Sequence, residues 1–169
     1  MAILARLARP GEAPALTLPV DGRQSARAMS IRRGVCRRLR AEGLALIPEV
    51  TLRSGRRADV VALSAAGEIT IVEIKSSIED FRADQKWMDY RAHCDRLFFA
   101  TTLDVPCEIF PNDTGLIVAD AFGAQIRCEA PEHRLHASTR KSMMLGFARC
   151  AALRLQALAD PAGPFAAEF

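Results

Sequence analysis

The chain has 169 residues, of which 50% are hydrophobic and 25% are charged, and its formal net charge is +3 at pH 7. This length suits one domain with loose ends, and the composition excludes a disordered chain, a collagen and a disulfide-dense miniprotein. The longest apolar runs are too short for a transmembrane helix, and Arg6 and Arg9 interrupt the N-terminus before a signal peptide could form. We therefore expect a cytoplasmic protein without a membrane partner.

The first half of the chain predicts an arm, a helix and three strands. Residues 1–26 contain Pro and Gly breaks without a sustained period, and we interpret them as an N-terminal arm. Apolar residues recur every four positions from Ala28 to Glu42 with arginines between them, which predicts a helix that ends at Gly43. Three strand patterns follow, at residues 46–52, 57–63 and 68–75.

A second helix is predicted to begin after Ser76 and Ser77 and to run to about His93, with acidic residues near its positive N-terminal end. We expect its apolar side to comprise Phe81, Gln85, Met88 and Ala92. Later strand patterns occur at residues 96–101, 114–119 and 124–128. A last helix is predicted from about Ser138 to Leu158, with an inner stripe of Met144, Phe147, Ala151, Leu155 and Leu158.

The interleaved order of helices and strands predicts one α/β domain, in which helices flank a central mixed β-sheet. We expect this domain to occupy residues 27–158, followed by a Pro-, Gly- and Ala-rich tail at 159–169. A hairpin and a helix would close the domain at its C-terminal end.

The five cysteines are widely spaced and contain no CxxC pair, which argues against a disulfide framework and a structural zinc site. We expect all five to be reduced and buried as small hydrophobic residues. One metal-like group, Cys128 with His133 and His136, has irregular spacing and lacks a fourth ligand. A pair of loop histidines is the better interpretation of that group.

Positive charge is concentrated between Arg27 and Arg57, where nine arginines stand against two glutamates, a local balance of +7. Out of a total of +3, this leaves −4 for the rest of the chain. Such a distribution is typical of a phosphate-binding surface. The alternative is a solvated helix face in a protein that uses arginine in preference to lysine.

The hairpin predicted between Arg57 and Lys75 gathers charged residues at one end. Side chains alternate along a strand, so Glu73 and Lys75 share a face. A turn centred on Ala66 places three pairs of residues opposite each other: Leu63 and Ile69, Val61 and Ile71, and Asp59 and Glu73. Two carboxylates and an ammonium group would then meet at the end of an apolar hairpin.

Burying these charges without partners would cost several kcal/mol, so something must compensate them. A divalent metal ion between Asp59 and Glu73 would do so, because Mg²⁺ prefers carboxylate, carbonyl and water oxygens. The alternative is a structural salt bridge between Lys75 and one of the two carboxylates at an exposed strand end.

The pattern of Asp59, thirteen intervening residues and then Glu73-Ile74-Lys75 on a hairpin, followed by a helix, resembles the PD-(D/E)XK nuclease superfamily. A longer resemblance, to the MmcB-like family of bacterial DNA repair proteins, extends over PEVTLRSGRRADVVAL, EITIVEIKSSIEDFRADQKWMDYRAHCDRLFFA, DTGLIVADAFGA and APEHRL. The resemblance implies a restriction-endonuclease-like domain with an αβββαβ core.

The same resemblance implies that Asp59 and Glu73 bind one Mg²⁺ or Mn²⁺ ion, with the carbonyl oxygen of Ile74 as a third ligand. Lys75 would orient or deprotonate the attacking water and offset charge in the transition state. These roles agree with the general chemistry of metal-bound water and neighbouring cations. In this sequence Ala58 replaces the proline of the motif, a position that binds nothing.

Many members of the superfamily carry a further acidic residue on the first helix. Here that helix offers Glu42, in its last turn and facing away, so Glu49 on the first strand is the better candidate for an additional metal ligand. The alternative interpretation of Glu49 is an ordinary surface residue of a strand.

Candidates for nucleic-acid binding are Arg53, Arg56, Arg57, Ser76 and Gln85. The arginines flank the strand that carries Asp59, and Gln85 stands where some superfamily nucleases carry a glutamine that contacts the phosphate or the water. Ser76 precedes a helix whose free amide groups could receive a phosphate. Trp87 and Tyr90 could stack on an unpaired base, but packing is the better interpretation.

The leading hypothesis is a metal-dependent nuclease that hydrolyses phosphodiester bonds of DNA during repair. The second hypothesis is a non-catalytic DNA-binding or adaptor module on the same fold. The expected partners are DNA, other repair proteins and a second copy of the chain, and the expected cofactor is Mg²⁺ or Mn²⁺.

Overall fold

The computed structural model describes residues 25–84 and 86–160, and almost all of the expected arm and tail lies outside this part of the chain. In chain order its elements are α1 (Ala26–Ala41), β1 (Ala45–Thr51), β2 (Arg57–Leu63), β3 (Ile69–Ile74), α2 (Ile78–Ala83), α3 (Met88–Arg91), β4 (Arg96–Thr101), η1 (Cys107–Ile109), β5 (Gly115–Ala119), β6 (Ala124–Cys128) and α4 (Ala137–Ala159).

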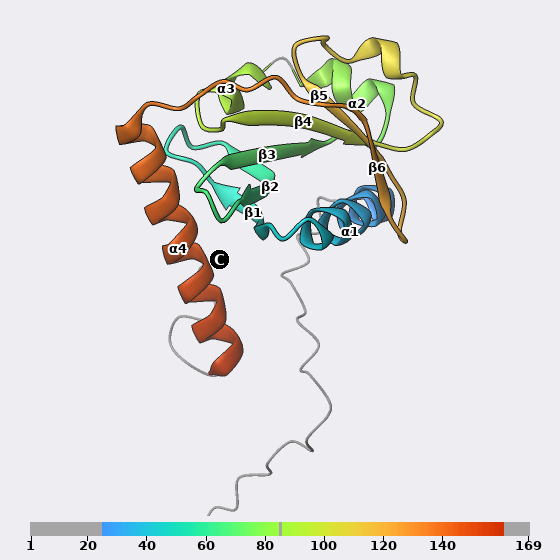
Figure 1. Ribbon diagram of the computed structural model, residues 1–169. Coiled ribbons are helices and arrows are strands. Elements are labelled where there is room, and N and C mark those ends of the chain that lie inside the picture. The colour runs from blue at the N-terminus through green and yellow to red at the C-terminus, as the bar shows by residue number, and fades with distance from the viewer. Residues whose placement is uncertain (1–24, 85, 161–169) are drawn as a thin grey trace, which may run out of the picture.

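The six strands of the described residues form one mixed sheet in the order β1-β2-β3-β4-β5-β6 (Figure 1). Antiparallel pairs join β1 to β2, β2 to β3 and β5 to β6, whereas β3, β4 and β5 run parallel. The carboxyl ends of β3, β4 and β5 therefore meet at one edge of the sheet, where β2 begins. The predicted single α/β domain with a central mixed sheet is confirmed.

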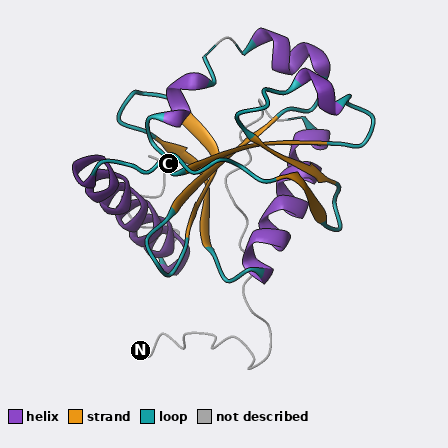
Figure 2. Cartoon of the chain, turned by 45° about the horizontal axis from the view of Figure 1, so that its top comes forward, coloured by secondary structure: helices purple, strands orange, loops and turns teal. Residues whose placement is uncertain are grey.

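Helix α1 covers one face of the sheet, and α4 lies on the other side of it (Figure 2). Buried α1 residues recur at positions 31, 35 and 39, the spacing of one helix face, and contact alternate residues of β2 to β5. Gly43 adopts a φ of +82°, a conformation that glycine reaches without strain, and the helix ends just before it as predicted.

A glycine in the middle of α1 allows the helix to approach the turn between β5 and β6. A Cβ atom at Gly34 would lie 2.2 Å from the carbonyl oxygen of Asp120 and 2.3 Å from that of Gly123. Both neighbours are backbone atoms, so neither can rotate away. We expect Gly34→Ala to lower the free energy of unfolding by about 1–3 kcal/mol, the usual cost of overpacking, as measured by urea denaturation.

The matched control is Gly146→Ala in α4, where nothing lies within 4 Å of the added Cβ. Alanine is about 1 kcal/mol more favourable than glycine in a helix interior, so this substitution should stabilise the protein. A stabilising effect of Gly34→Ala as well would contradict the close approach of α1 to the turn.

The prediction of a single helix from after Ser77 to about His93 is wrong, because the chain forms two short helices there, α2 and α3. Asp84 ends α2, and its side chain accepts a hydrogen bond from the Lys86 backbone N–H at 3.1 Å. Aspartate competes with the helix for backbone donors in this way and favours a turn. The break also exposes Met88, which was predicted on the apolar side of the helix but is 64% exposed. Trp87 and Tyr90 pack against the core, as expected for these two residues.

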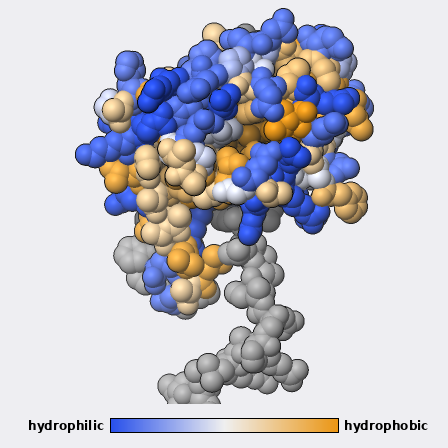
Figure 3. Space-filling view, viewed as in Figure 1, coloured by the Kyte–Doolittle hydropathy of each residue, from blue (hydrophilic) through white to orange (hydrophobic). Residues whose placement is uncertain are grey.

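The bounds predicted for the last helix are close to those of α4, and Phe147 of the predicted inner stripe packs against the core, but the other four members of the stripe are exposed. The residues that pack against the core are Met143, Phe147 and Cys150. Five large apolar residues of α4 are exposed: Met144, Leu145, Leu153, Leu155 and Leu158. Figure 3 shows apolar surface along this helix. Two of the predicted members stand one position beyond a residue that packs, Met144 beyond Met143 and Ala151 beyond Cys150, and one position turns a helix by about 100°.

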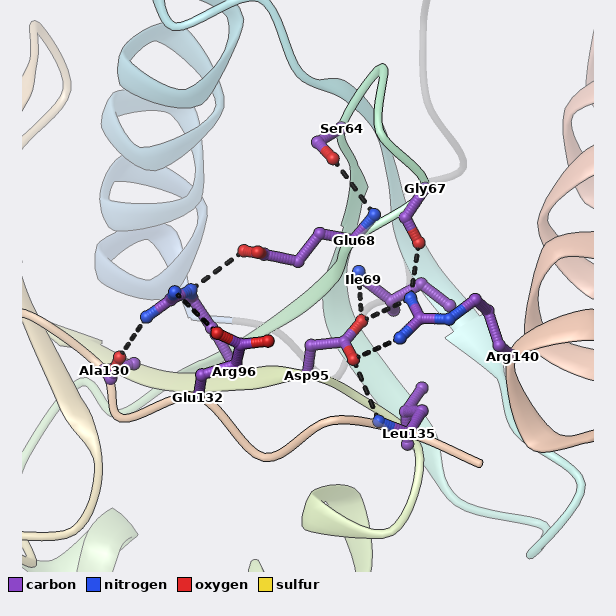
Figure 4. A network of polar contacts seen from close by, with 10 residues as sticks. All are labelled: Ser64, Gly67, Glu68, Ile69, Asp95, Arg96, Ala130, Glu132, Leu135 and Arg140. Carbon is purple, nitrogen blue, oxygen red and sulfur yellow. Dashed lines mark hydrogen bonds and ion pairs between the residues drawn. The ribbon is translucent and has the colours of Figure 1, made fainter. Parts of the chain in front are cut away.

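A buried carboxylate holds the beginning of α4 against the sheet (Figure 4). Asp95, at the start of β4, accepts hydrogen bonds from the backbone N–H groups of Ile69 and Leu135 at 2.8 and 3.0 Å. Arg140 of α4 donates to both oxygens of Asp95 and to the Gly67 carbonyl. Arg140 is therefore engaged inside the protein.

The five cysteines are free thiols. Cys94 is buried, but Cys107 and Cys128 are exposed, so the expectation that all five are buried is wrong for these two. Among the described residues, no helix is both long enough and apolar enough to cross a membrane.

Candidate functional site

The hairpin of β2 and β3 brings Asp59 and Glu73 side by side. The structure pairs Leu63 with Ile69 and Val61 with Ile71, which confirms the predicted register. Regular pairing extends to Val60 and Val72, which are the chain neighbours of Asp59 and Glu73. The expected gathering of carboxylates at the end of the hairpin is therefore present.

Both carboxylates are held by the backbone where the ladder between β2 and β3 stops. Glu73 Oε1 accepts a hydrogen bond from the Asp59 backbone N–H at 3.2 Å, and Asp59 Oδ2 accepts one from the Ile74 N–H at 2.8 Å. The side chains thus satisfy donors that the ladder would otherwise pair. This arrangement fixes the two carboxylates relative to the sheet.

Burial makes the ionised forms of both carboxylates unfavourable. Loss of solvent raises the pKa of Glu73 well above its usual range, and the neighbouring charge of Asp59 raises it further. Burial also raises the pKa of Asp59, against the lowering effects of the Ile74 N–H and of Lys75. Glu73 is 3% exposed, so solvent screens little of this repulsion. The positive charge of Lys75 offsets only part of this cost for Glu73.

The nearest ammonium group is bonded elsewhere. Lys75 is buried, and its Nζ atom forms an ion pair with Asp84 Oδ2 at 2.5 Å. The alternative considered for this region, a salt bridge from Lys75 to Asp59 or Glu73, is thus replaced by a pair with a carboxylate from the end of α2. The lysine lowers the pKa of both site carboxylates through space without bonding to either.

An open cavity of about 490 Å³ gives access to these groups. It lies at the sheet edge where β3 ends and β2 begins, next to the N-terminus of α1. Its lining comprises Ser25, Ala28, Arg57, Asp59, Glu73, Ile74, Lys75, Ser76, Asp80, Asp84 and Tyr90. The sequence-predicted residues Arg57, Ser76 and Ile74 therefore share one cavity with Asp59, Glu73 and Lys75.

Glu49 lies next to this cavity rather than in its lining. It forms ion pairs with Arg32 at 2.5 Å and with Arg57 at 3.7 Å. Its φ of +53° is unusual for a residue other than glycine, and strand pairing skips from Pro48 to Val50 around it. The side chain thus holds two arginines beside the site, and its role as a metal ligand stays a prediction.

Two of the other predicted nucleic-acid contacts, Arg53 and Arg56, lie outside the lining of this cavity. Arg56 forms an ion pair with Asp89 at 3.0 Å, and Arg53 donates a hydrogen bond to Ser142 at 3.3 Å. Ser76 donates through its backbone and hydroxyl groups to Asp80. Gln85 lies outside the described residues.

Much of the basic block is engaged in contacts within the protein. Seven of its nine arginines have a partner in the fold: Arg27, Arg32, Arg37, Arg38, Arg53, Arg56 and Arg57. Exposed ion pairs are weak enough to exchange for a phosphate contact. The positive patch therefore consists largely of paired arginines rather than of a solvated helix face alone.

The donor set suits a hard divalent cation. Two adjacent carboxylates with raised pKa values gain most from a positive charge placed between them, and oxygen ligands are those that Mg²⁺ and Mn²⁺ prefer. Within the described ranges, no group of three or more His, Cys, Asp or Glu side chains could hold a metal. Main-chain carbonyl oxygen and water would complete the coordination of one ion.

Sequence reasoning missed Asp84 and Tyr90 as cavity residues. Asp80 and Asp84 are four residues apart, the spacing of one helix face, and both line the cavity. This spacing could have indicated that the two residues lie together. Their predicted position near a helix N-terminus led instead to the interpretation that they stabilise the helix. Tyr90 was considered for base stacking but interpreted as a packing residue, and it both packs against the core and lines the cavity.

The chain matches a family model and a solved structure. A family model described as DNA repair protein MmcB-like matches residues 16–162. A solved structure of a protein of unknown function from Silicibacter pomeroyi is 45% identical, with a TM-score of 0.78, and the match covers 83% of this chain and 96% of that chain. No curated protein sequence matches.

Proposed function

Because the chain belongs to the MmcB-like family of DNA repair proteins, we propose that it is a metal-dependent nuclease that hydrolyses phosphodiester bonds of DNA during repair. The observation that carries this proposal is the pair of adjacent, poorly solvated carboxylates, Asp59 and Glu73, in an open cavity that also contains Lys75. A PD-(D/E)XK-type site is the interpretation that the order of these residues supports best.

Asp59 and Glu73 would hold one Mg²⁺ or Mn²⁺ ion, with the Ile74 carbonyl oxygen as a further ligand. A bound divalent ion lowers the pKa of its water and neutralises charge on the phosphate. Lys75 would orient the attacking water and stabilise the additional negative charge of the transition state. The N-terminus of α1, capped by Ser25 and without acidic residues in its first turn, favours phosphate at the same cavity.

The test is cleavage of labelled single-stranded, duplex, flap and abasic-site DNA by the purified protein with Mg²⁺ or Mn²⁺. Wild type is compared with Asp59→Asn and Lys75→Ala. We expect cleavage by wild type, and a loss of about 10²–10³-fold or more in each variant, as for removal of a group that stabilises transition-state charge.

The outcomes separate the two functional hypotheses. Cleavage that survives both substitutions would contradict the assignment of the site. Salt-sensitive DNA binding without cleavage, unchanged by either substitution, would favour a non-catalytic DNA-binding or adaptor module instead.

A further inference from the structure

The contact between Lys75 and Asp84 has a consequence for the two site carboxylates. Lys75 extends from the end of β3 and is nearly buried, so its ammonium group requires a negative partner inside the protein. Besides Asp84 at the end of α2, the cavity lining contains Asp59 and Glu73 of the same hairpin and Asp80, whose side chain accepts hydrogen bonds from Ser76. The ammonium is paired with Asp84.

Asp84 is fixed for this contact from two directions. One carboxylate oxygen accepts the Lys75 ammonium, and the other accepts the backbone N–H of Lys86. Three residues earlier, Phe81 packs against Phe99 and Phe110, with ring centroids 5.3 and 4.9 Å apart. The end of α2, and with it Asp84, is thereby anchored to the core.

We propose that Asp84 is a positioning residue that draws the Lys75 ammonium away from Asp59 and Glu73 and so leaves this carboxylate pair available to a divalent cation. The inference rests on the proposed metal site. Without Asp84, the best remaining partners of the buried ammonium are the two site carboxylates. Lysine would then compete with the metal for the same oxygens.

The first test is Mn²⁺ binding measured by isothermal titration calorimetry. We expect Asp84→Asn to weaken binding about tenfold, because a positive charge moved next to a partly buried site shifts such an equilibrium by a power of ten or more. Asp80→Asn is the matched control: it removes the same charge from the lining of the same cavity, but Asp80 bonds to Ser76. It should change the affinity much less.

A double-mutant cycle shows whether Asp84 acts through the lysine. In a Lys75→Met background, Asp84→Asn should have no further effect on Mn²⁺ affinity. An equal loss in both backgrounds, or an equal loss for Asp80→Asn and Asp84→Asn, would overturn the inference, because simple removal of negative charge would then explain the result.

The second readout needs no metal. The chain has three lysines, Lys75, Lys86 and Lys141, so the ammonium signals of a ¹⁵N-lysine sample can be assigned by substitution. We expect Glu73→Gln to leave the Lys75 signal nearly unchanged in the wild-type background and to shift it in the Asp84→Asn background. A Lys75 ammonium signal that does not shift on Glu73→Gln in either background would overturn the inference.

The two readouts separate this inference from the proposed function. Wild type that binds no Mn²⁺ would contradict the metal site, and the ammonium spectra would still decide where Lys75 goes when Asp84 is removed. Circular dichroism of each variant establishes that it is folded.

Discussion

Replacement of Asp95 with alanine is expected to destabilise the protein by about 3–5 kcal/mol, the range for breaking one side of a buried ion pair. The side chain of Asp95 is 2% exposed and accepts four hydrogen bonds, two from backbone N–H groups and two from Arg140. Alanine would leave these donors without their partner. Urea denaturation at pH 7 measures the change.

The control for Asp95→Ala is Glu42→Ala, which removes the exposed pair of Glu42 with Arg38. Such a pair contributes less than about 1 kcal/mol. Comparable losses for the two variants would contradict the account of the Asp95 network as the attachment of α4.

The same network predicts a pH dependence. Burial would raise the pKa of Asp95, but the hydrogen bonds from Arg140, Ile69 and Leu135 outweigh it and hold the pKa below its usual value. Because the pKa of Asp95 is lower in the folded protein, its carboxylate contributes stability above its unfolded pKa of about 4. This contribution is lost as the pH falls through the folded pKa. The free energy of unfolding of Asp95→Asn should therefore fall less than that of wild type as the pH is lowered from about 5 to about 2.

Glu73→Gln is expected to have opposite effects on stability and activity. At pH 8 it should stabilise the metal-free protein by about 1–4 kcal/mol, as replacement of poorly compensated buried charge often does. It should also lower nuclease activity by about 10²–10³-fold or more, because it removes an oxygen ligand and its charge. Thermal denaturation and DNA cleavage measure the two effects.

The sign of the stability effect follows from the raised pKa of Glu73. The folded state holds its proton to higher pH than the unfolded state, so the metal-free protein loses stability as the pH rises from about 4 through the folded pKa. Glutamine abolishes this loss. Mn²⁺ should stabilise wild type, which it binds in the folded state, and leave the variant unchanged.

Glu68→Gln is the control for Glu73→Gln, because Glu68 lies before β3 and pairs with Arg96 outside the cavity. It should alter neither activity nor the response to Mn²⁺. Destabilisation by Glu73→Gln at pH 8, together with unchanged activity, would show that Glu73 has a structural role alone.

Local patterns predicted most of the fold. Alternating apolar residues gave the register of β2 and β3, and that register places Asp59 beside Glu73. The helix break at Asp84 was not predictable from periodicity, because the apolar spacing continues across it while the aspartate side chain satisfies a turn. The inner face of α4 was predicted correctly at Phe147 but one position late at Met144 and Ala151, because apolar residues stand at both 143 and 144 and at both 150 and 151.

The candidate site was predictable only where it is local in the sequence. Asp59, Glu73 and Lys75 lie on one hairpin, so strand alternation brought them together. The pairing of Lys75 with Asp84 depends on how Phe81 anchors α2 to Phe99 and Phe110, contacts between segments that no local pattern relates. The arginine partners of Glu49 likewise come from α1 and β2.

The most direct measurement of the central claim is calorimetric titration of the metal-free protein with Mn²⁺ at pH 8, for wild type and Asp59→Asn. We expect one bound ion per chain in wild type and loss of binding in the variant, since Asp59 and Glu73 supply the charge that holds the ion. Absence of binding to wild type, or equal binding to both proteins, would contradict a metal site at Asp59 and Glu73.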